Sequence, residues 1–177
     1  MELKPQELLI LLKAIAHPER RFTYAALAKE LSMSSAEVHA SVKRAVNAGL
    51  AVSRGRGHWS PIRPALFEFL QHGVRYAFPA TLGPIKRGVA TSFGVEPLAS
   101  QLSAGQEEVP VWAYPEGLHK GPSLSPIYRT VPQAALSDPA LHRLLALLDA
   151  LRLGRARERD IAARCMAKEL GVINAAI

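Results

Sequence analysis

Local breaks cut the first 48 residues into three short helical segments, and this division limits the folds that the chain can adopt. Residues 5–16 begin with a proline and carry leucine and isoleucine three or four positions apart, which is the spacing of an amphipathic helix. The His-Pro pair at 17–18 ends this helix, because the residue before a proline avoids the α conformation. Thr23 can then cap a second helix over residues 24–31.

A third helix is predicted over residues 34–48. Ser34 and Glu37 have the spacing of a capping box, and Gly49 supplies the C-terminal stop. The inward face is apolar and consists of Val38, Val42, Ala45 and Val46. The outward face is small and polar and consists of Ser35, Ala36, His39, Ala40 and Lys43. Short side chains on this face permit a close approach to a partner.

A β-hairpin is predicted directly after this helix. Two short runs, 50–53 and 58–60, flank Arg54-Gly55-Arg56-Gly57, and a glycine-containing connection of this kind closes a hairpin. The glycines permit a sharp turn, while the two arginines load its tip with positive charge. Trp59 is predicted to pack the hairpin against the core, as an aromatic residue in a strand usually does.

The succession of helix, helix, short turn, helix and charged hairpin resembles the winged helix-turn-helix family, in particular MarR-like transcriptional regulators. The resemblance is carried by residues 22–59, FTYAALAKELSMSSAEVHASVKRAVNAGLAVSRGRGHW. It implies sequence-specific binding of double-stranded DNA, with the third helix in the major groove and the hairpin on the backbone or minor groove. Ala40 stands where relatives often carry an arginine or another long polar side chain. From the resemblance over residues 22–59 we expect a winged helix DNA-binding domain over residues 1–73.

The expected DNA contacts combine short polar side chains with cations, because a duplex presents base edges in its grooves and closely spaced phosphates along its backbone. Ser35 and Ala36 are expected to face base edges. His39 and Lys43, one turn apart, extend the same face along the groove. The full set is Thr23, Ser34, Ser35, Ala36, His39, Ala40, Lys43, Arg44, Arg54, Arg56 and His58.

The net charge of +7 is concentrated toward the two ends of the chain. Residues 1–64 hold ten Lys and Arg against five Asp and Glu, and residues 139–177 hold seven against four. Residues 65–138 hold five against six. A basic balance favours polyanionic partners where it is concentrated, so the N-terminal segment fits the expectation of a nucleic-acid partner.

The middle of the chain is less regular. A short helix is predicted over residues 65–72, and short strands are predicted over 89–93 and 109–114. Residues 74–133 hold many prolines and glycines, and hydrophobic periodicity fades there. A connection this long is uncommon inside a domain, so a small packed unit of undefined fold is expected.

Two helices are predicted near the C-terminal end. Asp138 caps the first, whose leucine stripe runs to Gly154, and the second spans residues 157–170. The expected fold is therefore α+β and mainly helical, an N-terminal winged helix-turn-helix followed by a mixed region, residues 74–177. This region is expected to serve oligomerisation or to bind a partner or effector. Because terminal helices of winged-helix regulators commonly build the dimer, the resemblance also implies a homodimer.

Several function classes find no support in the sequence. No apolar run is long enough to cross a bilayer and the first residues do not form an export signal, so no membrane partner is expected. A single cysteine, Cys165, points to a reducing cytoplasm. The six histidines lack metal-ligand spacing, and no nucleophile elbow or phosphate-binding glycine loop occurs. We expect no cofactor, no metal, no catalytic residue and no enzymatic activity.

Alternatives stay open. Arg54 and Arg56 can be ordinary solvated charges on a surface turn. The arginine-rich run 152–160 is interpreted as a solvated helical face, with a second polyanion contact as its alternative. The chain can also be an antitoxin-like protein that binds a partner protein through its C-terminal region and regulates its own gene through the winged helix. A third class is an enzyme whose site lies in the irregular middle.

Overall fold

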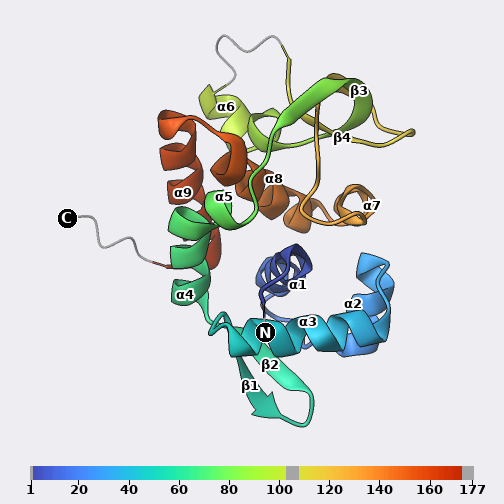
Figure 1. The fold of residues 1–177 in the computed structure, drawn as a ribbon, viewed down its shortest axis with the longest axis vertical. Helices are drawn as coiled ribbons and strands as arrows, with labels where there is room; N and C mark the ends of the chain where they lie inside the picture. Colours follow the sequence, from blue (N-terminus) through green and yellow to red (C-terminus); the bar gives the residue numbers. More distant parts are fainter. Residues whose placement is uncertain (1, 103–107, 173–177) are drawn as a thin grey trace, which may run out of the picture.

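The computed structural model describes residues 2–102 and 108–172. These residues form an α+β fold, mainly helical, with two small sheets (Figure 1). The elements in chain order are α1 (Pro5–Ala16), α2 (Tyr24–Leu31), α3 (Ser35–Asn47), β1 (Ala51–Gly55), β2 (His58–Pro61), α4 (Arg63–Glu68), the π-helical turn η1 (Phe69–Gly73), α5 (Val74–Ala77), β3 (Leu82–Ala90), the 3-10 turn η2 (Ser92–Gly94), α6 (Leu98–Leu102), β4 (Val111–Ala113), β5 (His119–Leu124), α7 (Val131–Leu136), α8 (Pro139–Leu153) and α9 (Ala156–Leu170). Within the described ranges, no helix has both the length and the apolar character that a membrane span requires.

Helix α1 is the centre of the molecule, between the N-terminal elements and the C-terminal helices (Figure 1). Residues 8–12 are each at most 1% exposed. Because successive residues of a helix point in different directions, α1 is buried on all sides. It packs on both α3 and α8. The two ends of the chain therefore share one apolar core.

The helices predicted in the N-terminal segment are confirmed almost residue for residue. α1 and α2 have the predicted bounds, and α3 begins at Ser35 because Ser34 is its cap. Thr23 caps α2 by accepting a hydrogen bond from the Ala26 backbone N–H at 3.1 Å. Ser34 and Glu37 form the predicted capping box. These helix starts are fixed by residues three positions apart, which is why the sequence alone located them.

The predicted hairpin is confirmed as β1 and β2, which pair antiparallel. Ser53 lies opposite Trp59, and the pairing slips by one residue before Gly55. The turn residues Arg56 and Gly57 both have positive φ, 50° and 77°, as in the type I′ turns that suit two-residue hairpins. Trp59 is partly buried and packs against the core, as predicted.

Strands β3, β4 and β5 close into a small barrel at the end of the molecule opposite the hairpin (Figure 1). β3 pairs antiparallel with both other strands, and β4 pairs with β5 in parallel. The closure needs glycine. A Cβ atom on Gly88 would lie 1.9 Å from the Trp112 carbonyl oxygen, and one on Gly121 would lie 1.9 Å from that of Val109. Any larger residue would push the strands apart.

The prediction of strands over 89–93 and 109–114 is wrong in its bounds. β3 already begins at Leu82 and ends at Ala90, and β4 covers only 111–113. The strand ends because Thr91 turns its hydroxyl toward Asp149 at 2.8 Å and the next residue takes up a φ of 54°. β5, α6 and α7 were not predicted.

The helix predicted over residues 65–72 is longer than expected. It begins at Arg63 as α4, passes through the π-helical turn η1 and ends at Ala77 as α5. The boundary predicted between residues 73 and 74 falls inside this continuous helical segment. The division of the chain into a DNA-binding and a C-terminal unit stays a prediction.

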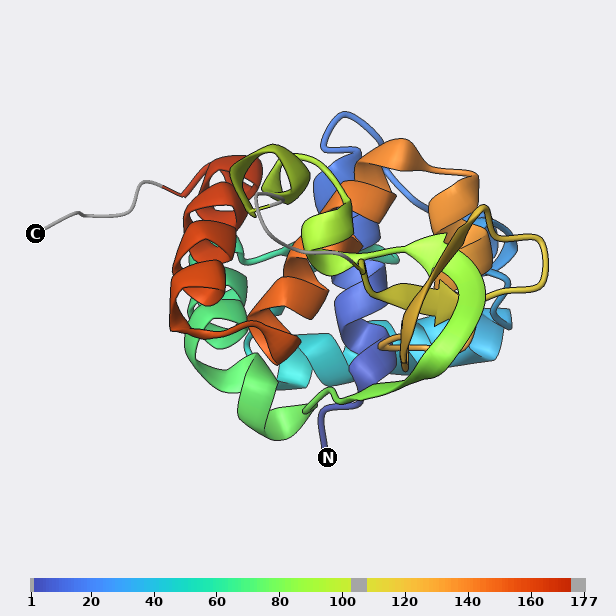
Figure 2. The same cartoon turned by 90° about the horizontal axis from the view of Figure 1, so that it is seen from above.

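The two C-terminal helices are confirmed as α8 and α9. Asp138 caps α8 by accepting a hydrogen bond from the Leu141 backbone N–H at 3.1 Å. α8 packs on both α9 and α1 (Figure 2), and residues 144–151 are all buried. Its leucine stripe is therefore core. α9 keeps an exposed stripe that consists of Arg157, Asp160, Arg164 and Lys168. If the predicted homodimer forms through these helices, α9 is available for the contact between subunits, whereas the leucines of α8 are not.

A buried carboxylate fixes α8 to the barrel. Asp149 is 1% exposed. Its donors are Thr91 Oγ1 at 2.8 Å, Trp112 Nε1 at 2.7 Å and Arg152 Nη1 at 2.7 Å. Burial raises the pKa of Asp149, and the charge of Arg152 and the three hydrogen bonds oppose this shift. Arg152 also donates to the Phe78 carbonyl at 2.9 Å, so helix, barrel and the chain before β3 meet at one cluster.

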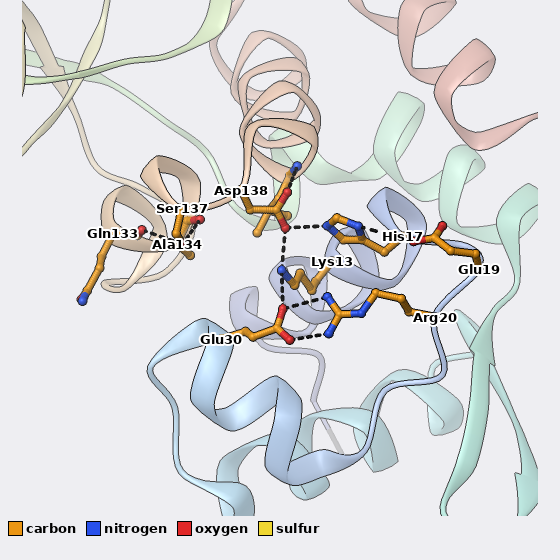
Figure 3. Close-up of polar contacts among 10 residues, drawn as sticks. Lys13, His17, Glu19, Arg20, Glu30, Gln133, Ala134, Ser137 and Asp138 are labelled. Carbon is orange, nitrogen blue, oxygen red and sulfur yellow. Dashed lines mark hydrogen bonds and ion pairs between the residues drawn. The ribbon is translucent and has the colours of Figure 1, made fainter.

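A polar network joins α1, α2 and the start of α8 (Figure 3). Lys13 Nζ lies 2.5 Å from Asp138 Oδ2 and 2.8 Å from Glu30 Oε2. His17 Nε2 bonds the same Asp138 oxygen at 2.7 Å. Arg20 contacts both carboxylate oxygens of Glu30 with its two terminal nitrogens. These contacts attach α2 to α1 and to the start of α8.

Candidate nucleic-acid interface

The outward face of α3 is open to solvent. Its exposed members are Ser35, Ala36, His39 and Lys43, whereas Ala40 is half-buried. On the opposite side, Val38 is fully buried and Val42 and Ala45 are almost so. The predicted orientation of this helix is therefore confirmed. A partner can approach α3 along a face of short side chains.

Helix α2 braces this face from one side. The rings of Tyr24 and His39 meet edge to face, with centroids 5.2 Å apart and planes at 81°. This contact restricts the His39 side chain while the residue stays exposed. Thr23, at the start of α2, is also exposed. Its oxygen already accepts the Ala26 N–H, so its O–H remains to donate to an acceptor such as a phosphate.

Lys43 and Arg44 are neighbours in sequence but lie in different environments. Lys43 is exposed and pairs with no acidic side chain among the described residues. The guanidinium of Arg44 turns inward, donating to Glu7 at 2.7 Å and to Ser41 at 3.0 Å. Glu7 is fully buried, so it needs this counter-ion. Arg44, predicted from the sequence as a DNA contact, is half-buried and engaged by the buried Glu7, so it is left out of the interface.

The tip of the hairpin carries the other cations. Arg54, Arg56 and His58 are exposed, and their side chains form no hydrogen bond or ion pair with another residue in the described part of the chain. The hairpin extends beyond α3 on the side away from the barrel (Figure 1). Because the turn is built from two positive-φ residues, it is narrow and places Arg56 at its apex.

The start of α3 is held by residues that the sequence analysis missed. Tyr128 donates from its hydroxyl to Glu37 at 2.9 Å, and Arg129 lies 3.7 Å from the same oxygen. The backbone N–H of Ser34, then Tyr128, lower the pKa of Glu37 to about 2. The Ser34 hydroxyl accepts the Glu37 N–H at 3.1 Å and so serves the cap. No sequence signal links Tyr128 to Glu37, which are 91 positions apart.

The structure offers no basis for a metal site within the residues it describes. The described residues contain no group of three or more His, Cys, Asp and Glu placed to hold a metal ion. Cys165 is half-buried on α9, and its nearest polar contact is Gln101 Nε2 at 3.6 Å. The exposed face of α3 and the hairpin tip therefore stand out by their charge and their openness.

No protein-family model matches the chain, and comparisons with curated proteins and with solved structures give no significant match. The likeness to winged helix-turn-helix regulators thus depends on residues 22–59 alone. The functional argument has to be made from the geometry and charge of α3 and the hairpin.

Proposed function

We propose that the chain binds double-stranded DNA in a sequence-specific manner, as a winged helix-turn-helix transcriptional regulator. In this proposal α3 enters the major groove and the β1–β2 turn contacts the backbone or the minor groove. The observation that supports it most is the joint exposure of two features. α3 offers a solvent-open face with Lys43, and the adjacent turn offers Arg54 and Arg56; none of these three side chains pairs with an acidic residue of the described chain.

The residues of α3 have distinct roles in the proposal. Ser35 and Ala36 are small, so the first turn of the helix can approach base edges closely. His39 and Lys43 lie one turn apart on the same exposed face, where they reach bases or phosphates further along the groove. Thr23 donates its hydroxyl to a phosphate at the groove edge.

The acidic residue nearest to this face does not oppose an approaching polyanion strongly. Glu37 is the acidic residue of α3, and its carboxylate is engaged by Ser34, Tyr128 and Arg129. Arg129 is 69% exposed in its side chain, and its positive charge offsets that of Glu37. The Glu37–Arg129 pair therefore adds no net negative charge that would repel a polyanion at the helix start.

The proposal is tested by selecting duplexes from a random-sequence library and measuring affinity for the selected site by fluorescence anisotropy at several salt concentrations. We expect one sequence motif to be enriched. We expect Lys43→Gln, Arg54→Gln and Arg56→Gln each to lower the slope of log affinity against log salt by about one, because each removes one phosphate contact. The control Lys86→Gln, in the exposed first part of β3, should leave the slope unchanged.

Two results would contradict the proposal. One is that no duplex is enriched over the input library. The other is that the three variants keep the salt slope of the unmodified protein. His39→Ala distinguishes recognition of the bases from electrostatic attraction to the phosphates. Loss of a base contact changes the selected motif, while the slope of log affinity against log salt stays the same. A palindromic motif with half-sites one helical turn apart would also support the homodimer.

A further inference from the structure

A pocket of about 510 Å³ lies between the α1–α2 connection and the hairpin. Residues of the connection, of β1 and β2, and of the start of α4 line it. A volume of this size falls in the range of small-molecule sites, roughly 300 to 1,000 Å³. It adjoins the proposed DNA-contacting turn but is concave, whereas the turn projects outward.

The charged lining of this pocket is entirely cationic. Four arginines and a histidine line it, Arg20, Arg21, Arg54, Arg63 and His58, and no Asp or Glu does. The charge of Arg20 is neutralised by Glu30, which lies outside the lining. Arg63 donates to the Leu170 backbone carbonyl at 2.8 Å and pairs with no carboxylate among the residues that the structure describes. Arg21 and Arg54 form no ion pair with any described residue and face solvent. Three arginines that pair with no carboxylate of the described residues, Arg21, Arg54 and Arg63, therefore line one cavity.

The rest of the lining is apolar and aromatic. Ile15 forms part of it and is only 4% exposed. Phe22 already carries Arg20 over its ring at 4.2 Å. The half-buried Trp59 lines the pocket from β2 and is not engaged in any ring or cation contact within the described part of the chain. The indole is therefore the surface on which a planar group can stack.

We propose that this pocket binds a small phosphorylated ligand with a planar ring, of the nucleoside phosphate class. Guanidinium forks match phosphate oxygens in a bidentate way, and three of them exceed what a singly charged carboxylate would use. The indole of Trp59 supplies the stacking surface for the base. Because Arg54 and His58 belong both to the pocket and to the turn, an occupied pocket competes with DNA. This competition, unlike the pocket itself, rests on the proposed function.

Binding is measured first in the absence of DNA, by titrating each of the four common nucleoside 5′-monophosphates, inorganic pyrophosphate and adenosine into the protein by calorimetry. We expect at least one monophosphate to bind, with adenosine about tenfold weaker or more, because it lacks the groups that pair with arginine. Binding should also change the tryptophan fluorescence through Trp59, since the second tryptophan, Trp112, is fully buried elsewhere.

Variants of Arg21 test whether the ligand binds in this pocket. Arg21→Gln should weaken monophosphate binding about tenfold, and Arg21→Lys should restore it only in part, because lysine keeps the charge but not the fork. Arg21 is exposed and bonds no described residue, so these variants are expected to fold. Lys86→Gln removes the same charge far from the pocket and should bind as the unmodified protein does.

Failure of all four monophosphates to bind at millimolar concentration would overturn the inference. So would equal binding by Arg21→Gln and the unmodified protein. If pyrophosphate binds as tightly as the monophosphates, the stacking part of the inference is wrong. If Arg21→Gln weakens only DNA binding, the pocket is a phosphate contact of the duplex and not a ligand site. Conversely, monophosphate binding without any DNA binding would leave the pocket in place and refute the proposed function.

Discussion

Lys13 and Asp138 form a buried ion pair, with Nζ and Oδ2 2.5 Å apart, although 125 positions separate them in the chain. The same carboxylate accepts the Leu141 N–H and so caps α8. Burial alone would raise the pKa of Asp138, but the bonds from Lys13, Leu141 and His17 outweigh it and lower this pKa. One side chain therefore starts α8 and attaches it to α1.

Replacing Asp138 by alanine should reduce the free energy of unfolding by about 3 to 5 kcal/mol, because it removes a helix cap and half of a buried ion pair. Urea unfolding followed by circular dichroism measures this loss. The control is Asp160→Ala on α9, which breaks an exposed pair with Arg164. Exposed pairs contribute about 1 kcal/mol or less. Equal losses in the two variants would show that the Asp138 network does not stabilise the fold.

The stability of the protein should fall in acid. Hydrogen bonds from Arg20 lower the pKa of Glu30 to about 2, burial opposes the shift, and Lys13 adds to it. A carboxylate with a lowered folded pKa stabilises the fold fully above its unfolded value of 4.5, and this contribution is lost as the pH falls toward 2. The urea midpoint should decline across this interval. Glu30→Gln should be less stable at pH 7 and lose less on acidification, whereas an unchanged pH profile would contradict the assignment.

Substitution of two neighbouring cations on α3 should change the stability of the protein by very different amounts. Arg44→Met leaves the fully buried Glu7 without its counter-ion, so we expect the free energy of unfolding to fall by about 3 to 5 kcal/mol. Lys43→Met changes an exposed side chain and should alter it by about 0.5 kcal/mol or less. Chemical denaturation of both variants decides the matter. Similar values would mean that the Arg44–Glu7 pair does not stabilise the fold.

Substitutions in the hairpin turn should change the stability of the protein through the backbone conformation alone. Gly57 has φ of 77°, and a Cβ atom added to it would meet no atom within 4 Å. Gly57→Ala should therefore cost about 1 to 2 kcal/mol from the left-handed conformation, without a clash. Arg56→Gly, at a φ of 50°, should remove a strain of the same kind and raise the melting temperature. Thermal unfolding of both variants should show shifts of opposite sign.

The sequence predicted the helices well where short-range chemistry sets their ends. The spacing of Ser34 and Glu37 marks the start of α3, and Asp138 followed by proline marks the start of α8. It also predicted which side of α3 would face solvent, because helical periodicity separates Val38 and Val42 from the polar positions.

The barrel escaped prediction for a physical reason. Gly88, Gly117 and Gly121 look like loop signals in a sequence, yet in the structure each lies where another strand or its connection comes too close for a side chain. A single sequence does not distinguish a glycine that bends the chain from one that permits close approach. The inward turn of Arg44 escaped for a related reason, because its partner Glu7 lies 37 positions away.

The central position of α1 decides whether α3 and the hairpin, the elements of the proposed DNA interface, can fold apart from the rest of the chain. Residues 8–12 are covered on every side, and part of that cover is α8, from the far end of the chain. A fragment cut after residue 73 would leave leucines of α1 in water and Lys13 without Asp138. The segment that contains α3 and the hairpin is therefore not expected to fold on its own. Its rigid placement depends on packing against the last third of the polypeptide.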